Sequence, residues 1–175
     1  ETRANLKKDL KTQTKDIETI LSEFKTVRPI KFTSKVEEYT LFWKIRKGLF
    51  PAVGAVRKIG TTVIIEDVAY PIESLSQATL ELQSLFEKHG YHQALIFGHA
   101  LEGNFHFVFT QDFNDEKEVK RYDDFMNDVT NSVAVKYQGS LKAEHGTGRN
   151  MAAFIELEWG KSAFDTMESI KNLFD

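Results

Sequence analysis

One order of elements constrains the fold of this chain more than any other feature. The segment "TTVIIEDVAY" (61–70) is rich in β-branched residues and predicts a strand. Two more strands are expected at "QALIFGH" (93–99) and "NFHFVFTQ" (104–111), joined by the turn "ALEG", and "GSLKAEHGTG" (139–148) begins extended. With one helical pattern after the first strand and one after the third, the order is β-α-β-β-α-β. This order predicts a ferredoxin-like split βαβ fold of the α+β class, with an antiparallel sheet and helices on one face.

The two helical patterns of this unit are amphipathic. Residues 73–90 carry an apolar stripe at helical spacing and end at Gly90, and a second helix is expected from Asp115 to about Tyr137. Asp115 and Glu118 have the spacing of a capping box at the start of that second helix. The stripe of the first pattern consists of Leu75, Ala78, Leu82, Leu85 and Phe86.

Further helices flank this unit. One is expected from Thr2 to about Phe24, and another follows Ser34 and runs to Gly48. Residues 48–60 contain glycines and a proline and are expected to form a loop. Two C-terminal helices, at about 150–159 and 162–174, are separated by Gly160. We expect residues 1–175 to form a single domain with additional N- and C-terminal helices.

Composition excludes several classes of function. The chain has no cysteine, so it holds no disulfide, zinc-thiolate site or iron-sulfur cluster of its own. A net charge of -3 gives no basic field, and we expect no nucleic-acid partner. No apolar run approaches the roughly 18 residues of a membrane-spanning helix, so no transmembrane segment is expected. A metal in this chain would need nitrogen and oxygen ligands.

Two short motifs offer such ligands. "GHALEGNFH" places His99 and His106 on either side of the expected hairpin turn, and "AEHGTGR" contributes Glu144 beside His145. Two imidazoles and a carboxylate suit zinc, manganese or iron, with positions left open for water or substrate. The alternative is that the histidines are only hydrogen-bonded or exposed beside a turn. The strand order decides whether Glu144 reaches the hairpin, and the sequence leaves that order open.

Other residues also leave two interpretations. Arg46 and Lys47 end an expected helix, where cations favour the helix dipole, but a buried arginine would clamp a carboxylate. We expect His89 and His92 to be solvated. The rings at positions 105, 107 and 109 alternate along one strand, so they form either a core or an exposed surface for assembly.

Several motifs together resemble one family. "GHALEGNFHFVF" and "GSLKAEHGTGRNMAAFIELEWG" resemble segments of the C-terminal domain of FAD-linked oxidases, and "FWKIRKGLFPAVGAV" and "TTVIIEDVAYPIESL" are similar to two further segments in the same order. The resemblance covers about Thr33 to Phe174. Members of the family include D-lactate, glycolate and D-2-hydroxyglutarate dehydrogenases, and "EHGTGRNMAAFIELEWG" is most similar to the subgroup with a downstream iron-sulfur region.

The resemblance implies roles for individual residues. His99, His106 and Glu144 match metal ligands, and His145 matches the base or substrate-binding histidine. Arg46 matches the arginine that holds the substrate carboxylate. Gly103 and Asn104 are expected to contact the flavin. The substrate is not specified, because Val108 stands where some relatives have asparagine. Glu66 and Asp67 likewise stand where some relatives have a lysine and a tyrosine before an aspartate.

The resemblance also implies partners. We expect a 2-hydroxy acid substrate, an FAD-binding domain in the same polypeptide, and an iron-sulfur region with a quinone or cytochrome as electron acceptor. The protein is expected in the cytoplasm, with the full-length form peripheral at the inner membrane. Residues 1–175 would be a piece of that flavoenzyme, inactive alone. The competing hypothesis is a non-catalytic module for assembly or ligand binding.

Overall fold

The computed structural model describes residues 2–175 and divides the chain into two units, one ending at Leu49 and the other running from Phe50 to Asp175. The first unit contains α1 (Lys7–Leu21), and α2 (Val36–Val56) extends across the boundary between the units. Both helices were expected, α1 being shorter at each end. The single domain predicted over residues 1–175 stays a prediction.

The expected loop over residues 48–60 is wrong in its first part, because α2 continues to Val56 through Pro51. Pro51 has no N–H to donate, which normally weakens a helix interior. The helix continues through residues that are mainly alanine, valine and other apolar types. At its end, Arg57 donates from Nη1 to the carbonyl of Gly54 at 2.5 Å and so satisfies a carbonyl of the last turn.

The second unit is built on an antiparallel sheet. Within residues 2–175 the sheet has three strands, β1 (Thr62–Ala69), β2 (Leu95–His99) and β3 (Asn104–Gln111), in the order β1-β3-β2. The centre strand pairs on one side with β1, where Asp67 lies opposite His106, and on the other with β2. The α+β class and the three strands were predicted correctly.

The hairpin between β2 and β3 depends on Gly103. A short 3-10 turn (Ala100–Glu102) precedes this glycine, which has a φ of 65°. A Cβ atom at this position would lie 2.0 Å from the carbonyl oxygen of Tyr70, and the Tyr70 N–H donates to the Gly103 carbonyl at 2.9 Å. Any larger residue would therefore be excluded both by the backbone conformation and by space.

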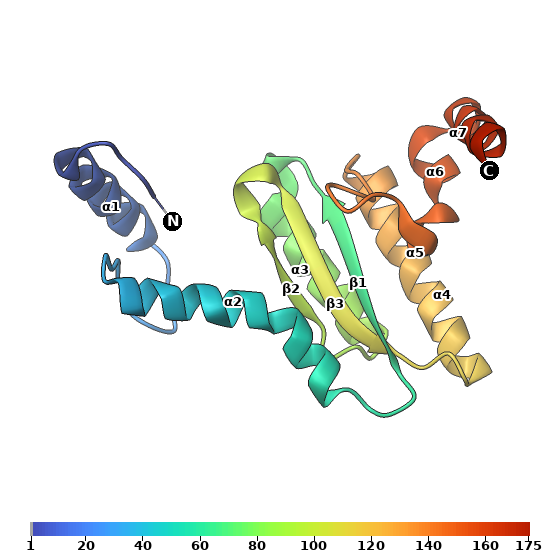
Figure 1. Cartoon of the computed structure of the whole chain (residues 1–175), viewed down its shortest axis with the longest axis horizontal. Coiled ribbons are helices and arrows are strands. Elements are labelled where there is room, and N and C mark those ends of the chain that lie inside the picture. The colour runs from blue at the N-terminus through green and yellow to red at the C-terminus, as the bar shows by residue number, and fades with distance from the viewer. Residues whose placement is uncertain (1) are drawn as a thin grey trace. The chain divides into compact units, whose positions relative to one another are not determined.

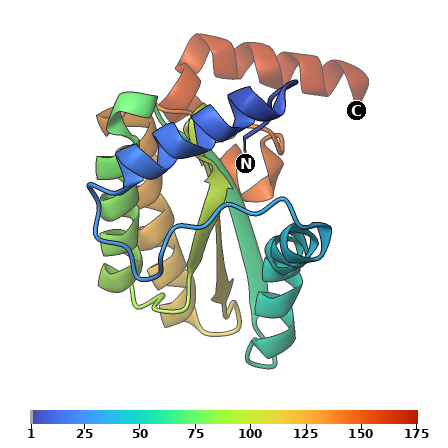
Figure 2. The same ribbon diagram turned by 90° about the vertical axis from the view of Figure 1, so that its left-hand side faces the viewer.

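Two helices cover one face of the sheet (Figures 1 and 2). They are α3 (Leu75–Lys88) and α4 (Glu116–Thr130), the second extended by a π-helical turn (Asn131–Lys136). Asp115 caps α4 by accepting from the N–H of Lys117, not in the reciprocal capping box that the spacing suggested. The aromatic side chains of β3 point into this layer, so the predicted alternative of a packed core holds. The buried rings there include Phe86, Phe107, Phe109 and Phe125.

The fourth expected strand is wrong. After α4 the chain makes a single bridge, with Ser140 paired to Ala69 on the outer side of β1, and then leaves the sheet. Three of the backbone N–H groups that follow donate to side-chain carboxylates instead of to the backbone of β1. Leu141 donates to Glu158, while Glu144 and His145 donate to Asp67. Side chains thus replace the ladder that would have continued the sheet.

The chain closes with α5 (Gly148–Ala152), α6 (Ile155–Trp159) and α7 (Lys161–Phe174). The first of the two expected C-terminal helices is therefore broken into two short ones. Gly160, with a φ of 76°, separates α6 from α7 as expected. No helix within residues 2–175 is long and apolar enough to cross a membrane.

Candidate metal-binding site

The face of the sheet opposite α3 and α4 carries the polar site. Successive residues of a strand point to opposite faces, so Asn104 and His106 lie on the other side of β3 from the core rings. The register places Asp67 beside His106 and pairs His99 with Asn104. His99 and His106 therefore project from the same face of the hairpin.

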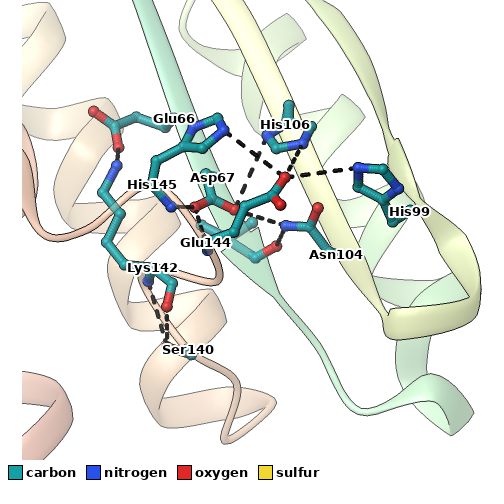
Figure 3. Close-up of polar contacts among 10 residues, drawn as sticks. Glu66, Asp67, His99, Asn104, His106, Ser140, Lys142, Glu144 and His145 are labelled. Atoms are coloured by element: carbon teal, nitrogen blue, oxygen red, sulfur yellow. Dashed lines mark hydrogen bonds and ion pairs between the residues drawn. The ribbon is translucent and has the colours of Figure 1, made fainter.

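Three side chains converge on this face (Figure 3). One ligand atom from each of His99, His106 and Glu144 lies within 4.8 Å of the other two. The Glu144 Oε1 atom is 3.0 Å from the Nε2 of His106 and 3.6 Å from the Nε2 of His99. His106 is buried, whereas His99 and Glu144 are half exposed. The cluster therefore opens to the solvent on one side.

These separations suit a shared cation. Zinc bonds to nitrogen and oxygen are about 2.0–2.2 Å, so neighbouring ligands around a tetrahedral ion lie about 3.3 Å apart. The same 3.0 Å contact also suits a direct hydrogen bond from His106 Nε2–H to Glu144. The donor set fits a divalent ion. The shared cation requires Nε2 of His106 without a proton, whereas the direct hydrogen bond to Glu144 requires a proton there.

His145 lies against the cluster. Its ring stacks on that of His106 at a centroid distance of 4.7 Å with an interplanar angle of 15°. Its Nε2 is 3.8 Å from Glu144 Oε1, and the side chain is 44% exposed. An imidazole held beside the ligands but open to solvent is placed to exchange a proton with a molecule bound there.

Asp67 is the buried acidic residue of the site. Its Oδ2 accepts the backbone N–H groups of Glu144 and His145, both at 2.8 Å. Its Oδ1 accepts from the Asn104 amide at 2.7 Å and lies 4.0 Å from the Nδ1 of His106. Burial raises the pKa of the Asp67 carboxyl, but these hydrogen bonds outweigh it and leave the pKa below its ordinary value. Asp67 is therefore a buried carboxylate at neutral pH.

The charge state of His106 follows from its surroundings. Burial is the largest cause that lowers its pKa below the ordinary value, and His145 acts in the same direction. The carboxylates of Asp67 and Glu144 oppose this effect but do not reverse it. His106 is therefore neutral at pH 7, the state in which an imidazole binds a metal.

Two more carboxylates hold the segment that carries Glu144 and His145. Glu158 on α6 accepts from the Ser140 hydroxyl at 2.8 Å and from the Leu141 N–H at 3.0 Å. Glu66 on β1, buried on the core side, accepts from Lys142 Nζ and from the Asn150 amide. We call residues 140–150 the ligand loop. It is attached at its start by Glu158, around its middle by Asp67, and on the opposite face of β1 by Glu66.

The remaining predicted residues have different outcomes. Asn104 is buried and donates to Asp67 and to the Val68 carbonyl, while its Oδ1 has no hydrogen-bond partner within residues 2–175. Gly103 forms the turn. Arg46 belongs to the first unit, where its guanidinium lies 5.7 Å from the ring centroid of Trp43. The flavin contacts of Gly103 and Asn104 and the substrate contact of Arg46 stay predictions.

Of the two histidines expected to be solvated, one is not. The His89 side chain is only 10% exposed and contacts Asp128 at 2.7 Å, packed edge-on against Phe125. It was misjudged because its partner comes from α4, far along the chain. His92 is 65% exposed, as expected, and contacts Glu87.

Asp67 was not predicted from the sequence to be part of the site. Glu66 and Asp67 were noted only as positions at which this chain differs from some relatives. Two consecutive acidic residues within the apolar strand "TTVIIEDVAY" are nevertheless a signal, since buried carboxylates require partners. The partners lie in the ligand loop about 75 to 85 residues later, which no local pattern shows.

The fold and the site together define a class: an α+β domain whose open sheet face carries two histidines and a glutamate, backed by a buried aspartate. The family model for the C-terminal domain of FAD linked oxidases matches residues 1–175. The chain belongs to this family, as its motifs predicted.

Curated relatives support the same assignment. The chain is 27% identical over 124 residues to "Glycolate oxidase subunit GlcD" of Bacillus subtilis, covering 71% of the chain and 26% of that protein. It is 32% identical over 143 residues to "Probable D-2-hydroxyglutarate dehydrogenase, mitochondrial" of Oryza sativa subsp. japonica, covering 80% and 23%. For "D-lactate dehydrogenase [cytochrome], mitochondrial" of Arabidopsis thaliana the identity is 29% over 150 residues, covering 82% and 25%. The chain thus spans about a quarter of the length of these relatives.

Proposed function

We propose that this chain is the substrate-binding and metal-binding domain of an FAD-dependent dehydrogenase that oxidises a D-2-hydroxy acid. Membership of the FAD-linked oxidase family supports the flavin and the reaction class. The names of the relatives, which act on glycolate, D-lactate or D-2-hydroxyglutarate, support the substrate class. The observation that carries the proposal is the convergence of His99, His106 and Glu144 on one open face.

In this proposal, His99, His106 and Glu144 hold a divalent cation, either zinc, manganese or iron. A bound cation of this kind would orient the substrate hydroxyl and lower its pKa. The half exposure of Glu144 and His99 supports an open position for that hydroxyl, because a structural metal site is normally closed by protein ligands.

His145 is proposed to accept the proton of the substrate hydroxyl. Its exposed imidazole beside Glu144 and its stack on His106 support that role. Arg46 is proposed to bind the substrate carboxylate, for which its planar guanidinium is suited. The flavin, bound by the FAD-binding domain of the longer protein, supplies the acceptor for hydride from the substrate carbon.

The test of the metal role is a titration of the purified chain with Zn²⁺, Mn²⁺ and Fe²⁺, followed by calorimetry and metal analysis. We expect near-stoichiometric binding of one of these ions. His99→Ala should weaken it by at least about tenfold, since it removes a ligand. His99 is half exposed, so this variant should keep its fold.

The matched control is His92→Ala, which removes an exposed histidine that lies outside the cluster. It should bind metal like the unchanged chain. Equal weakening in both variants would show that the ions bind to surface histidines in general. Absence of metal from the flavoprotein that contains this domain would contradict the metal role.

The base role needs the complete flavoprotein. There, His145→Ala should lower kcat by about 100-fold or more, in the range of a lost general base. The metal affinity of the His145→Ala variant should change little, because His145 is not one of the proposed ligands. An unchanged kcat would remove His145 from the mechanism and leave the metal proposal intact.

A further inference from the structure

Asp67 has the environment of a residue that organises other groups instead of reacting itself. Its side chain is fully buried at the centre of the polar face, opposite His106 in the register of β1 and β3. The carboxylate makes three hydrogen bonds, and all three donors belong to the site or to its supporting residues. It does not reach the open side where a substrate would bind.

One oxygen of Asp67 fixes the course of the ligand loop. Oδ2 accepts the N–H groups of two consecutive residues, Glu144 and His145. Hydrogen bonds to a charged acceptor are stronger than those between neutral groups. The direction in which the Glu144 side chain leaves the backbone is therefore set by Asp67, and the loop has no strand ladder at this point to set it instead.

The other oxygen faces the ring of His106. The Nδ1 atom of His106 is buried and has no hydrogen-bond partner among the described residues, and Asp67 Oδ1 is 4.0 Å away. A neutral imidazole carries one N–H. If Nε2 offers its lone pair to a cation, the proton must be on Nδ1, next to the negative charge of Asp67. Without a cation, Nε2–H is placed to donate to Glu144 at 3.0 Å.

We propose that Asp67 is a positioning residue for the metal-binding site: it fixes the loop that presents Glu144, and it stabilises His106 with its proton on Nδ1 so that Nε2 faces the cation. This inference rests on the proposed metal role of His99, His106 and Glu144. The His106 imidazole stays neutral when the metal binds, because it loses the proton on Nε2 and takes up one proton on Nδ1.

Two substitutions separate the shape of Asp67 from its charge. Asp67→Asn keeps the size and one acceptor oxygen for the two loop amides. The Asn104 amide can rotate to accept from the new amide group, since its own oxygen has no partner in residues 2–175. Asp67→Ala removes the charge and both acceptors. Loss of a group that supports a metal ligand typically weakens metal binding 10- to 100-fold.

The experiment is a Zn²⁺ titration of the purified chain and its variants by calorimetry. We expect about 10-fold weaker binding for Asp67→Asn and about 100-fold for Asp67→Ala. Amide hydrogen exchange should show the Glu144 and His145 amides protected in the unchanged chain and exposed in Asp67→Ala. ¹⁵N NMR of the imidazoles should show His106 protonated on Nε2 without zinc and on Nδ1 with zinc.

Glu66→Gln is the matched control. It makes the same change of charge one residue away, on the opposite face of β1, where Glu66 holds Lys142 and Asn150 of the same loop. It loosens one anchor of the loop without contacting Glu144 or His106, so it should weaken zinc binding by clearly less than Asp67→Asn does. If it weakens zinc binding as much as Asp67→Asn does, any anchor of the loop suffices and the specific role of Asp67 is wrong.

The other outcomes are also decisive. If both Asp67 variants bind zinc like the unchanged chain, the positioning role is overturned while the metal proposal stands. If the unchanged chain binds no zinc, the metal proposal fails and this inference fails with it. Should Asp67→Ala fail to fold, Asp67→Asn and the proton position on His106 decide; a proton that stays on Nε2 at saturating zinc overturns the inference.

Discussion

The two faces of strand β3 are both buried, yet they are buried in different ways. On the helix side, Phe107 and Phe109 lie within a cluster of rings, with Phe125 at 5.2 Å from Phe109. On the other side, His106 and Asn104 are also buried, but each leaves a polar atom without a hydrogen-bond partner within residues 2–175. The apolar face stabilises the fold through ring packing. The polar face contains buried atoms without hydrogen-bond partners, which lowers stability but leaves those atoms available to bind a ligand.

The largest effect that would test this contrast is expected on the helix side. Phe107→Ala should lower the free energy of unfolding by about 3–5 kcal/mol, because it leaves a cavity among rings that cannot close around it. Urea unfolding followed by circular dichroism measures this change. A loss below about 1 kcal/mol would show that the aromatic layer does not carry the stability of the second unit.

A smaller change in the free energy of unfolding, of the opposite sign, is expected at His106, one residue away. His106→Leu fills the same space but removes the buried Nδ1 that has no partner. Such an unpaired atom lowers stability by about 1–3 kcal/mol. The free energy of unfolding of the variant should therefore equal that of the unchanged chain or exceed it by about 1 kcal/mol. The same unfolding measurement, made beside a metal titration, should show binding abolished. A loss of more than about 2 kcal/mol would mean that His106 supports the fold as the rings do.

The smallest effect is expected at the outer side of the helix layer. Hydrogen bonds from Lys88 and His89 lower the pKa of Asp128 below its ordinary value. A carboxyl with a lowered pKa in the folded state stabilises the fold above its unfolded pKa of about 3.9, and loses that contribution as the pH falls through the folded value.

We therefore expect urea unfolding of the unchanged chain at pH 7 to give up to about 1 kcal/mol more stability than Asp128→Asn, a modest value because the pair is partly exposed. The two should converge as the pH falls through the lowered pKa of Asp128 in the folded state. A difference that persists at the lowest pH would mean that Asp128 acts through packing and not through its charge.

The same contrast explains how much the sequence could predict. Strand alternation and helical stripes are local, and they correctly gave β1, β2 and β3 and the buried positions of α3. The motifs at 98–106 and 143–149 gave His99, His106 and Glu144 as a set, and the structure brings these three together.

Two of the failures share one cause, which is pairing between distant segments. The ligand loop was expected to continue as a fourth strand, but its amides bond to carboxylates from β1 and α6. His89 was expected in solvent because Asp128 lies 39 residues further along the chain. Neither of these contacts has a local periodicity. The continuation of α2 to Val56 was missed for a local reason, because the glycines and the proline of residues 48–60 were taken to indicate a loop.

The single oxygen of Asp67 that accepts two consecutive amides has a mechanical consequence. The backbones of Glu144 and His145 are held at one point, so a shift of the backbone at one residue would also move the other. A larger ion that displaces the Glu144 carboxylate would turn the His145 ring through the same backbone. The identity of the metal would then be transmitted to the position of the proposed base, and exchange of one ion for another would change the rate of proton removal as well as the affinity of the site.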